Sequence, residues 1–161
     1  MNYFKVPITS HLAAEVLAYA QNTKDWVSYF NFSAIQLPHE VMRKDPFLHW
    51  LNTKYAMVVG VIRLEPNVCY DWHIDTNRGV GVNMLLTPEV RSNCLFAKGE
   101  GVQFGFEELV YEPNTFYLFN TQVKHMVLNY ESPRYLLTVE FALDKNNLSF
   151  EDLLQEVKKA A

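Results

Sequence analysis

Hydrophobic residues near the N-terminus recur at helical spacing. In residues 11–21, Leu12 and Val16 belong to one apolar stripe, and this stripe follows Ser10, a residue type that favours helix starts. The pattern predicts an amphipathic helix over 11–21. A shorter helix is predicted over 46–52.

The C-terminal segment repeats the helical spacing. Ser149 and Asp152 form a start that resembles a capping box, and Leu153 and Val157 lie on the apolar stripe that follows. Lys158 suits the negative end of a helix. We predict a terminal helix here and expect it to pack outside the core.

Between these helices the periodicity changes to that of strands. Residues 57–143 contain short β-branched and aromatic runs, broken by turn residues at intervals typical of all-β folds. Eight strands are predicted, at 57–64, 70–75, 80–86, 94–98, 102–106, 115–119, 125–130 and 134–143. No predicted helix separates them, which disfavours a parallel α/β fold. The pattern therefore predicts a mainly β fold, a double-stranded β-helix (jelly roll or cupin-like) with flanking N- and C-terminal helices.

Length and composition favour one domain over residues 1–161. Hydrophobic residues make up 49% of the chain, and no repeat, linker or charge block divides it. A chain of this size buries roughly two-thirds of its unfolded surface, so the fold needs neither a disulfide nor a structural metal. Any metal site in this chain is therefore expected to serve its function.

The charge and the longest apolar run exclude two kinds of partner. Eighteen acidic residues against fourteen basic ones give a net charge of −4, the wrong sign for a sequence-blind nucleic-acid binder. The longest apolar run, 55–62, is far shorter than the about 20 residues of a membrane-spanning helix.

Cys69 and Cys94 have no CxxC spacing and are interpreted as two reduced core thiols. With no signal-peptide pattern, we predict a cytoplasmic protein. The oligomeric state is not readable from the sequence pattern.

Candidate chemistry begins with His73 and Asp75. Residues two apart on a strand share one face, so these two side chains are expected to project together while Trp72 faces the other way. His125 opens a later predicted strand. Two imidazoles and one carboxylate with open positions form the facial triad of non-haem Fe(II) oxygenases. The three residues are thus candidate metal ligands.

Arg134 adds a candidate anion site. It follows the turn at 131–133, and a hairpin of 125–130 with 134–143 would place it ~15 Å from His125 along the backbone. A five-carbon dicarboxylate suits that gap, because a guanidinium grips a carboxylate through two parallel hydrogen bonds.

The order of these motifs resembles the 2-oxoglutarate/Fe(II)-dependent oxygenase superfamily and, within it, the aspartyl/asparaginyl β-hydroxylase-like branch. The similarity covers residues 57–143, the whole predicted β core. The segments that carry it are YDWHIDT at 70–76, VGVNMLL at 80–86, LFNTQVKH at 118–125, and Arg134.

The resemblance implies a role for five residues. His73, Asp75 and His125 would be the iron ligands, Arg134 the 2-oxoglutarate anchor, and Asn83 a polar side chain facing the cosubstrate. It also implies a hydroxylase that uses Fe(II), 2-oxoglutarate and O₂ and releases succinate and CO₂. The substrate would be amino-acid-like or peptidyl, and the protein would supply orientation and a dry pocket.

Two further residues are candidates for substrate contact. Arg78, in the turn after His73 and Asp75, either meets an anionic group of the substrate or is a solvated turn residue; Trp72 is the second candidate. The aromatic residues expected to wall the pocket are Trp72, Phe104, Phe116 and Phe119.

Two other classes of protein fit part of the pattern. A cupin-like metalloenzyme without 2-oxoglutarate would need the three ligands but not Arg134. A metal-free jelly-roll binding module would need only the fold.

Overall fold

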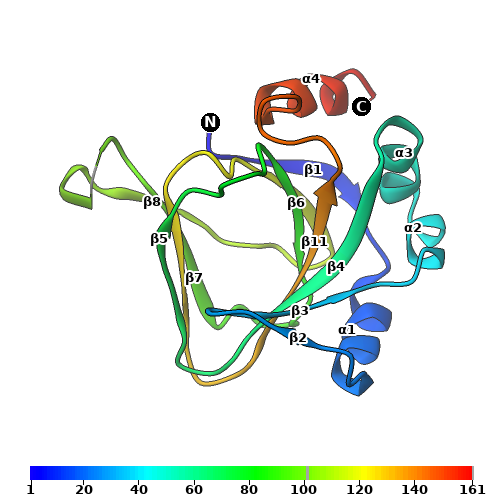
Figure 1. The fold of residues 1–161 in the computed structure, drawn as a ribbon, viewed down its shortest axis with the longest axis horizontal. Helices are drawn as coiled ribbons and strands as arrows, with labels where there is room; N and C mark the ends of the chain where they lie inside the picture. Colours follow the sequence, from blue (N-terminus) through cyan, green and yellow to red (C-terminus); the bar gives the residue numbers. More distant parts are fainter. Residues whose placement is uncertain (101, 161) are drawn as a thin grey trace.

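The computed structural model describes residues 1–100 and 102–160 and is built on two antiparallel sheets (Figure 1). The seven-stranded sheet has the order β1 (Tyr3–Thr9), β9 (Thr115–Phe119), β6 (Gly81–Leu85), β11 (Arg134–Phe141), β4 (Met57–Leu64), β3 (Ser33–Gln36) and β2 (Val27–Ser28). The four-stranded sheet has the order β5 (Cys69–His73), β10 (His125–Asn129), β7 (Ser92–Ala97) and β8 (Phe106–Leu109). From β4 to β11 the chain crosses repeatedly from one sheet to the other, and this arrangement is consistent with the predicted jelly roll.

The described residues contain eleven strands, three more than predicted. Strands β1, β2 and β3 precede the predicted core, and only one residue of β1, Val6, is buried, so the sequence alternates too weakly to reveal that strand. The predicted strand at 102–106 is wrong. Val102–Phe104 form a 3-10 helix, η1, and β8 begins only after Gly105, whose φ of +91° interrupts the chain direction. Gly101 lies outside the described residues.

Helices α1 (Ala13–Asn22), α3 (Pro46–Lys54) and α4 (Phe150–Ala160) occur where the pattern predicts helices, and α2 (Glu40–Lys44) is additional. The predicted capping box is present: the amide of Ser149 donates to Asp152 Oδ2 and the amide of Asp152 donates to Ser149 Oγ, both at 3.1 Å. Within the described residues, no helix has the length and apolar run needed to cross a membrane.

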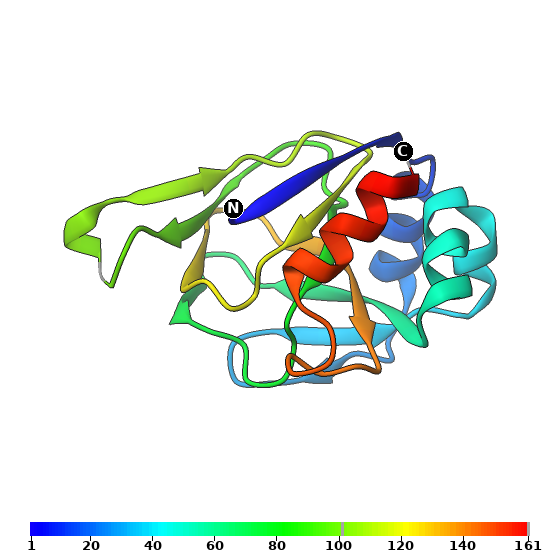
Figure 2. The ribbon, with the colours of Figure 1, turned by 90° about the horizontal axis from the view of Figure 1, so that it is seen from above.

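The main hydrophobic core lies between the helices and the outer face of the seven-stranded sheet. Alternate residues of β11, Leu137 and Val139, point into it and are fully buried. Phe150 and Leu153 of α4 are buried in the same cluster, so the expectation that α4 packs outside the core is wrong. A large sheet must bury its outer face as well, and α4 lies across it (Figure 1 and Figure 2).

The space between the two sheets holds a second, smaller apolar cluster. Phe96 from β7 packs there against Phe119 from β9, with ring centroids 4.6 Å apart. Toward β2 and β3 this filling stops, and a cavity remains that the inner faces of both sheets line. The candidate residues gather in this cavity.

Candidate metal centre

The fold places the two candidate histidines side by side. His73 is the last residue of β5 and His125 the first of β10; these strands are neighbours, and the two residues are direct register partners. Their ring centroids lie 4.2 Å apart. Residues 52 positions apart in the sequence are thereby brought together by the sheet.

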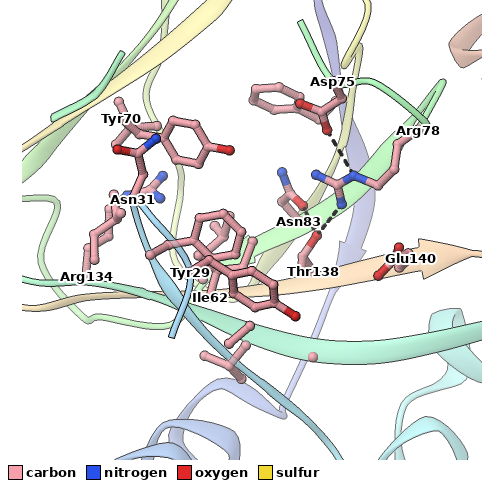
Figure 3. A pocket seen from close by; sticks show the side chains of 18 of the residues that line it. Tyr29, Asn31, Ile62, Tyr70, Asp75, Arg78, Asn83, Arg134, Thr138 and Glu140 are labelled. Carbon is pink, nitrogen blue, oxygen red and sulfur yellow. Dashed lines mark hydrogen bonds and ion pairs between the residues drawn. The ribbon is translucent and has the colours of Figure 1, made fainter. Parts of the chain in front are cut away.

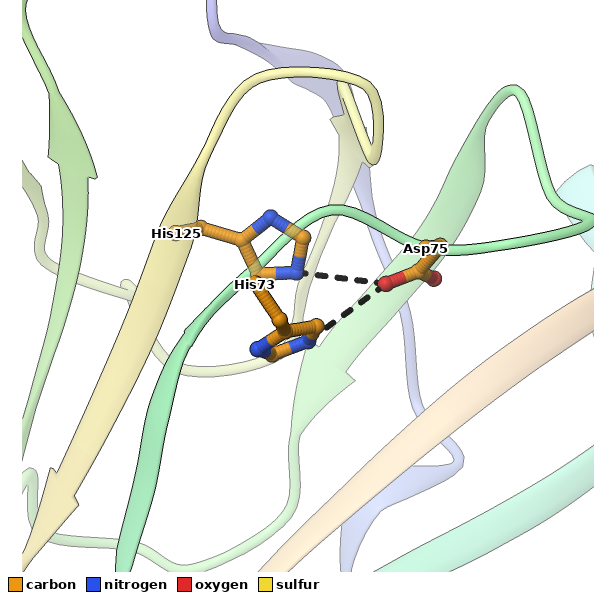
Figure 4. Close-up of side chains that lie close together, drawn as sticks. All are labelled: His73, Asp75 and His125. Atoms are coloured by element: carbon orange, nitrogen blue, oxygen red, sulfur yellow. Dashed lines mark ion pairs between the residues drawn. The ribbon is translucent and has the colours of Figure 1, made fainter. Parts of the chain in front are cut away.

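Asp75 completes the group from a different position than predicted. Strand β5 ends at His73, so Asp75 lies in the irregular segment that follows, where its amide donates to the carbonyl of Thr121 at 3.1 Å. Its Oδ1 lies 3.4 Å from Nε2 of His73 and 3.4 Å from Nε2 of His125 (Figure 4). The predicted convergence therefore holds, although the strand does not extend to Asp75.

Hydrogen bonds on the far side of each ring fix which nitrogen faces the group. Nδ1 of His73 donates to the carbonyl of Asp71, and Nδ1 of His125 donates to the carbonyl of Val123, both at 2.7 Å. A carbonyl can only accept, so each ring carries a proton on Nδ1. In the neutral ring the Nε2 lone pair is then free for a metal, whereas in the protonated ring Nε2–H donates to Asp75.

Three electron-rich atoms directed at one another call for a cation between them. The candidate ligand atoms all lie within 4.8 Å of one another. Ligands held by one transition-metal ion at about 2.0–2.2 Å are ~3 Å apart when adjacent, so a small contraction would suffice. The donor set, two neutral imidazoles and one carboxylate, fits non-haem Fe(II).

The electrostatics of the group keep the carboxylate ionised. Burial acts to raise the pKa of Asp75, but the imidazoles of His125 and His73 and the guanidinium of Arg78 outweigh it and hold this pKa well below its usual range. Burial acts to lower the pKa of His73, yet its bonds to Asp75 and to the Asp71 carbonyl leave that pKa raised. Asp75 is thus available as an anionic ligand at neutral pH.

Arg78 is held inside this group and does not lie free in a solvated turn. Its Nε donates to Asp75 Oδ2 at 3.0 Å, and its Nη1 donates to Thr138 Oγ1 of β11 at 3.2 Å. Thr138 Oγ1 donates in turn to Oδ1 of Asn83 on β6 at 2.8 Å. A continuous polar line therefore runs from the carboxylate to the seven-stranded sheet (Figure 3).

Arg134 lies on the opposite sheet from the two histidines. The predicted hairpin of 125–130 with 134–143 is wrong, because β10 pairs with β5 and β7 whereas β11 pairs with β4 and β6. The connection between them crosses from one sheet to the other, and Nδ2 of Asn129 braces it by donating to the carbonyl of Ser132 at 3.0 Å. Arg134 faces the histidines across the interior.

The Arg134 guanidinium is buried without a carboxylate partner in the part of the chain that the structure describes. Arg134 is 5% exposed, its Nε donates to Ser92 Oγ at 3.1 Å, and its Cζ lies 5.8 Å from the centre of the Tyr111 ring. Burying an unpaired charge is costly, so the geometry favours an anion beside it. Nδ2 of Asn83 approaches the Tyr111 hydroxyl at 3.5 Å, at the limit of a hydrogen bond.

One cavity of about 1130 Å³ connects these groups, and Figure 3 shows Arg134 and Arg78 on different sides of it. Its volume exceeds the upper end, about 1,000 Å³, of common ligand pockets, so it has room for more than one small molecule. The sequence-predicted residues that line it are His73, Asp75, Arg78, Asn83, Phe119, His125 and Arg134.

Three predicted aromatic contacts are wrong. Trp72 does not line the cavity, as expected for the residue that alternates with His73 on β5. Phe104 lies on η1 and is 63% exposed, and Phe116 is fully buried in the helix-covered core. Phe119 does line the cavity and meets His125 edge-on, with centroids 4.9 Å apart.

Three of the cavity residues that sequence reasoning missed contact the predicted site residues. Thr138 shares the inner face of β11 with Arg134, and strand periodicity alone could have identified it. Tyr70 stacks on His73, with centroids 4.1 Å apart, and fixes that ring. Tyr111 lies outside any strand, so no periodic signal marked it.

Sequence comparison identifies no relative: no protein-family model matches the chain, and no curated protein matches it. Solved structures do match. A prolyl-4-hydroxylase from Pseudomonas putida has a TM-score of 0.69 at 12% identity, over 88% of this chain and 92% of that one. A prolyl hydroxylase from Trichoplax adhaerens, in complex with a hypoxia inducible factor peptide fragment, has a TM-score of 0.67 at 15% identity, over 94% and 85%.

A third match carries the broader family description. An oxidoreductase of the 2OG-Fe(II) oxygenase family from Burkholderia pseudomallei has a TM-score of 0.62 at 11% identity, over 92% of this chain and 86% of that one. Identities this low concern the fold alone, and the aspartyl/asparaginyl hydroxylase-like branch stays a prediction. By its fold, this chain is similar to the 2OG-Fe(II) oxygenases.

Proposed function

We propose that this chain is an Fe(II)- and 2-oxoglutarate-dependent dioxygenase that hydroxylates an amino-acid-like or peptidyl substrate. The observation that carries the proposal is the meeting of His73 Nε2, His125 Nε2 and Asp75 Oδ1 in one cavity that also contains an unpaired buried guanidinium, Arg134. When bound, Fe(II) and 2-oxoglutarate supply the oxidising chemistry that couples decarboxylation of the cosubstrate to hydroxylation of a C–H bond.

His73, Asp75 and His125 would hold the metal. Their tautomers are set by backbone carbonyls, so each imidazole offers Nε2 without losing a proton. Three protein ligands leave coordination positions open for a cosubstrate and O₂. The ring of Phe119 packs against His125 and limits water on that side.

Arg134, with Asn83 and Tyr111 beside it, would hold 2-oxoglutarate. Arg134 and Thr138 are four residues apart on one face of β11, about 13 Å at the rise of a strand. Thr138 binds Arg78, the partner of Asp75, so this distance approximates the span from the anchor to the metal centre. An arginine side chain and a five-carbon dicarboxylate together suit that span, and the guanidinium would bind the distal carboxylate through two hydrogen bonds.

The substrate would enter between the β2–β3 connection and β5. Tyr29, Asn31 and Tyr70 line the cavity on this side (Figure 3). Trp72 is not among the residues that line the cavity, and its contact with a substrate stays a prediction. A peptidyl substrate is supported by the peptide fragment in the Trichoplax complex. A free amino acid or another small molecule would also fit the volume.

The rest of the chain supports the same site. We propose that residues 1–161 form one oxygenase domain, because the helices bury their apolar faces on the sheet that carries Arg134. A cytoplasmic location remains our prediction from the sequence.

Stepwise anaerobic ligand addition tests the proposal. Fe(II) is added first and 2-oxoglutarate second, and the visible charge-transfer band of the iron chelate is followed. The dioxygenase gives a band that needs both additions. Iron binding without a band would favour the cupin-like metalloenzyme, and no iron binding would favour the metal-free module.

A further inference from the structure

Two loops that carry the candidate ligands are tied to each other by hydrogen bonds. The amide of Asp75 donates to the carbonyl of Thr121 at 3.1 Å, and Oγ1 of Thr121 donates to the carbonyl of Arg78 at 2.5 Å. Nε2 of Gln122 donates to two carbonyls, those of Asp75 at 2.9 Å and Arg78 at 2.7 Å. Since Gln122 is three residues before His125, these bonds connect the segment holding one ligand to the segment holding another.

The Arg78 side chain acts on the Asp75 carboxylate itself. The Nε of Arg78 donates a hydrogen bond to Oδ2 of Asp75, which leaves Oδ1 as the oxygen that faces the two imidazoles. Its Nη1 is fixed by Thr138 on the central strand of the seven-stranded sheet, so the guanidinium is held from the opposite side of the cavity. The carboxylate has little freedom to rotate and offer its second oxygen.

We propose that Arg78 and Gln122 are positioning residues that fix Asp75 as a one-oxygen ligand before a metal binds. The inference rests on the proposed function, because it assumes the metal centre. Arg78 sets the rotation of the carboxylate, and Gln122 sets the separation of the Asp75 and His125 segments. A preformed site avoids ordering these loops at the moment of binding, and a one-oxygen carboxylate keeps coordination positions open.

The charge of Arg78 has an effect of its own. A guanidinium near a divalent cation repels it, so removing the charge would strengthen metal binding while removing the orientation would weaken it. The two effects are separated by Arg78→Lys, which keeps the charge and loses the paired Nε and Nη1 contacts. Gln122→Ala changes no charge, and the residue is exposed, so the fold should tolerate it.

Cobalt(II) titration of the full chain tests the inference without any turnover. Each variant is followed by the d–d absorption of bound Co(II), and thermal unfolding of the metal-free protein is measured in parallel. The matched controls are Arg91→Lys, an exposed arginine bonded to Glu89 and Glu131, and Gln155→Ala on the surface of α4.

We expect Arg78→Lys and Gln122→Ala each to weaken Co(II) binding about 10- to 100-fold, as removal of groups that orient metal ligands commonly does. Arg78→Lys should also change the shape of the d–d band, because the freed carboxylate can then bind through both oxygens. In the metal-free form, both variants should unfold at a temperature close to that of the wild type. Both control variants should keep the wild-type Co(II) affinity and the wild-type unfolding temperature.

Two results would overturn the inference while leaving the metal centre intact. One is wild-type affinity in both variants, and the other is a loss of affinity that only follows a loss of metal-free stability. A wild-type protein that binds no cobalt would overturn the proposed metal centre, and the inference with it.

Discussion

Replacement of Arg134 by methionine tests whether the buried guanidinium anchors 2-oxoglutarate. Methionine keeps much of the length and apolar contact of the side chain but removes the charge and all five donors. The change is confined to the inner face of β11, four residues from Thr138, so it should not reach the three candidate ligands. Metal affinity should therefore remain that of the wild type.

The size of the effect follows from burial. Arg134 is 5% exposed, and removing one partner of a buried ion pair costs about 3 to 5 kcal/mol because the other charge is left uncompensated. At 1.36 kcal/mol per tenfold change, the dissociation constant for 2-oxoglutarate should rise about 150- to 5000-fold. Arg134→Lys keeps the charge and loses one charged hydrogen bond, about 1.5 to 3 kcal/mol, so an intermediate rise of about 10- to 150-fold is expected.

The stability of the metal-free protein should respond differently. Among the described residues Arg134 has no carboxylate partner, so methionine gives up the bond to Ser92 and the contact with Tyr111 while removing a buried charge. These effects oppose each other, and the free energy of unfolding should stay within about 1 kcal/mol of wild type. Function would be lost without loss of the fold.

The assay is an anaerobic titration of the Fe(II)-loaded protein with 2-oxoglutarate, read at the visible chelate band and checked by calorimetry. Arg91→Met is the control, because Arg91 is an exposed arginine paired with Glu89 and Glu131. If Arg134→Met bound 2-oxoglutarate within about threefold of wild type, the anchor would be elsewhere and the cosubstrate assignment would lose its physical basis.

Further predictions test the burial of two cysteines and the cap of α3. The expectation that both cysteines are core thiols is wrong for Cys69, which is exposed, and holds for Cys94, which is buried. A thiol reagent at pH 8 should therefore label Cys69 and spare Cys94; mass spectrometry that found both labelled would contradict the packing. Burial raises the pKa of Cys94 to about 11, so the unfolded chain loses this proton near pH 9 while the folded protein keeps it. Stability should therefore fall by about 2 to 3 kcal/mol as the pH rises from 9 to 11, and urea unfolding of Cys94→Ala should lack this part of the loss. Asp45→Ala should cost about 2 kcal/mol in urea unfolding, because Asp45 caps α3 through the amides of Phe47 and Leu48 and accepts from Ser10; a cost under about 0.5 kcal/mol would refute that role.

Local chemistry in the sequence predicted the local features well. The capping box of Ser149 and Asp152 depends on residues three apart, and it forms as the spacing indicates. Strand periodicity also placed β4 and β9 with the bounds that the structure has. Such features need only near neighbours in the chain, so the pattern contains all the information required.

Residue types alone suggested that His73 and His125 meet, but they could not establish it. The meeting depends on β5 pairing with β10, a contact between distant segments for which the sequence offers no local signal. Asp75 was expected on the strand, yet the bond from its amide to the Thr121 carbonyl holds it in the irregular segment after β5. The three side chains still converge, because strand pairing brings His73 to His125 and the Thr121 bond holds Asp75 beside them.

Errors occurred where the choice of partner strand decides the geometry. The segments 125–130 and 134–143 are adjacent in sequence, which favours a hairpin, but each pairs with other strands in a different sheet. The sequence does not reveal the edge strands β1 and β2 or the short strand β3 beside β2, because each buries at most one residue and alternates weakly. Tyr111, in an irregular segment, reaches the cavity only through tertiary packing.

The alternation along β11 has a consequence for how this protein can change over generations. Leu137 and Val139 look toward the helices and sustain the fold, while Thr138 and Glu140 look into the cavity. Substitutions at positions 138 and 140 change the cavity and leave the helix-covered core intact, so a randomised library restricted to those two positions should retain folded members. A single residue inserted into β11 would turn the core-facing side chains toward the cavity and the cavity-facing side chains toward the core. Both the helix-covered core and the cavity would then be disrupted.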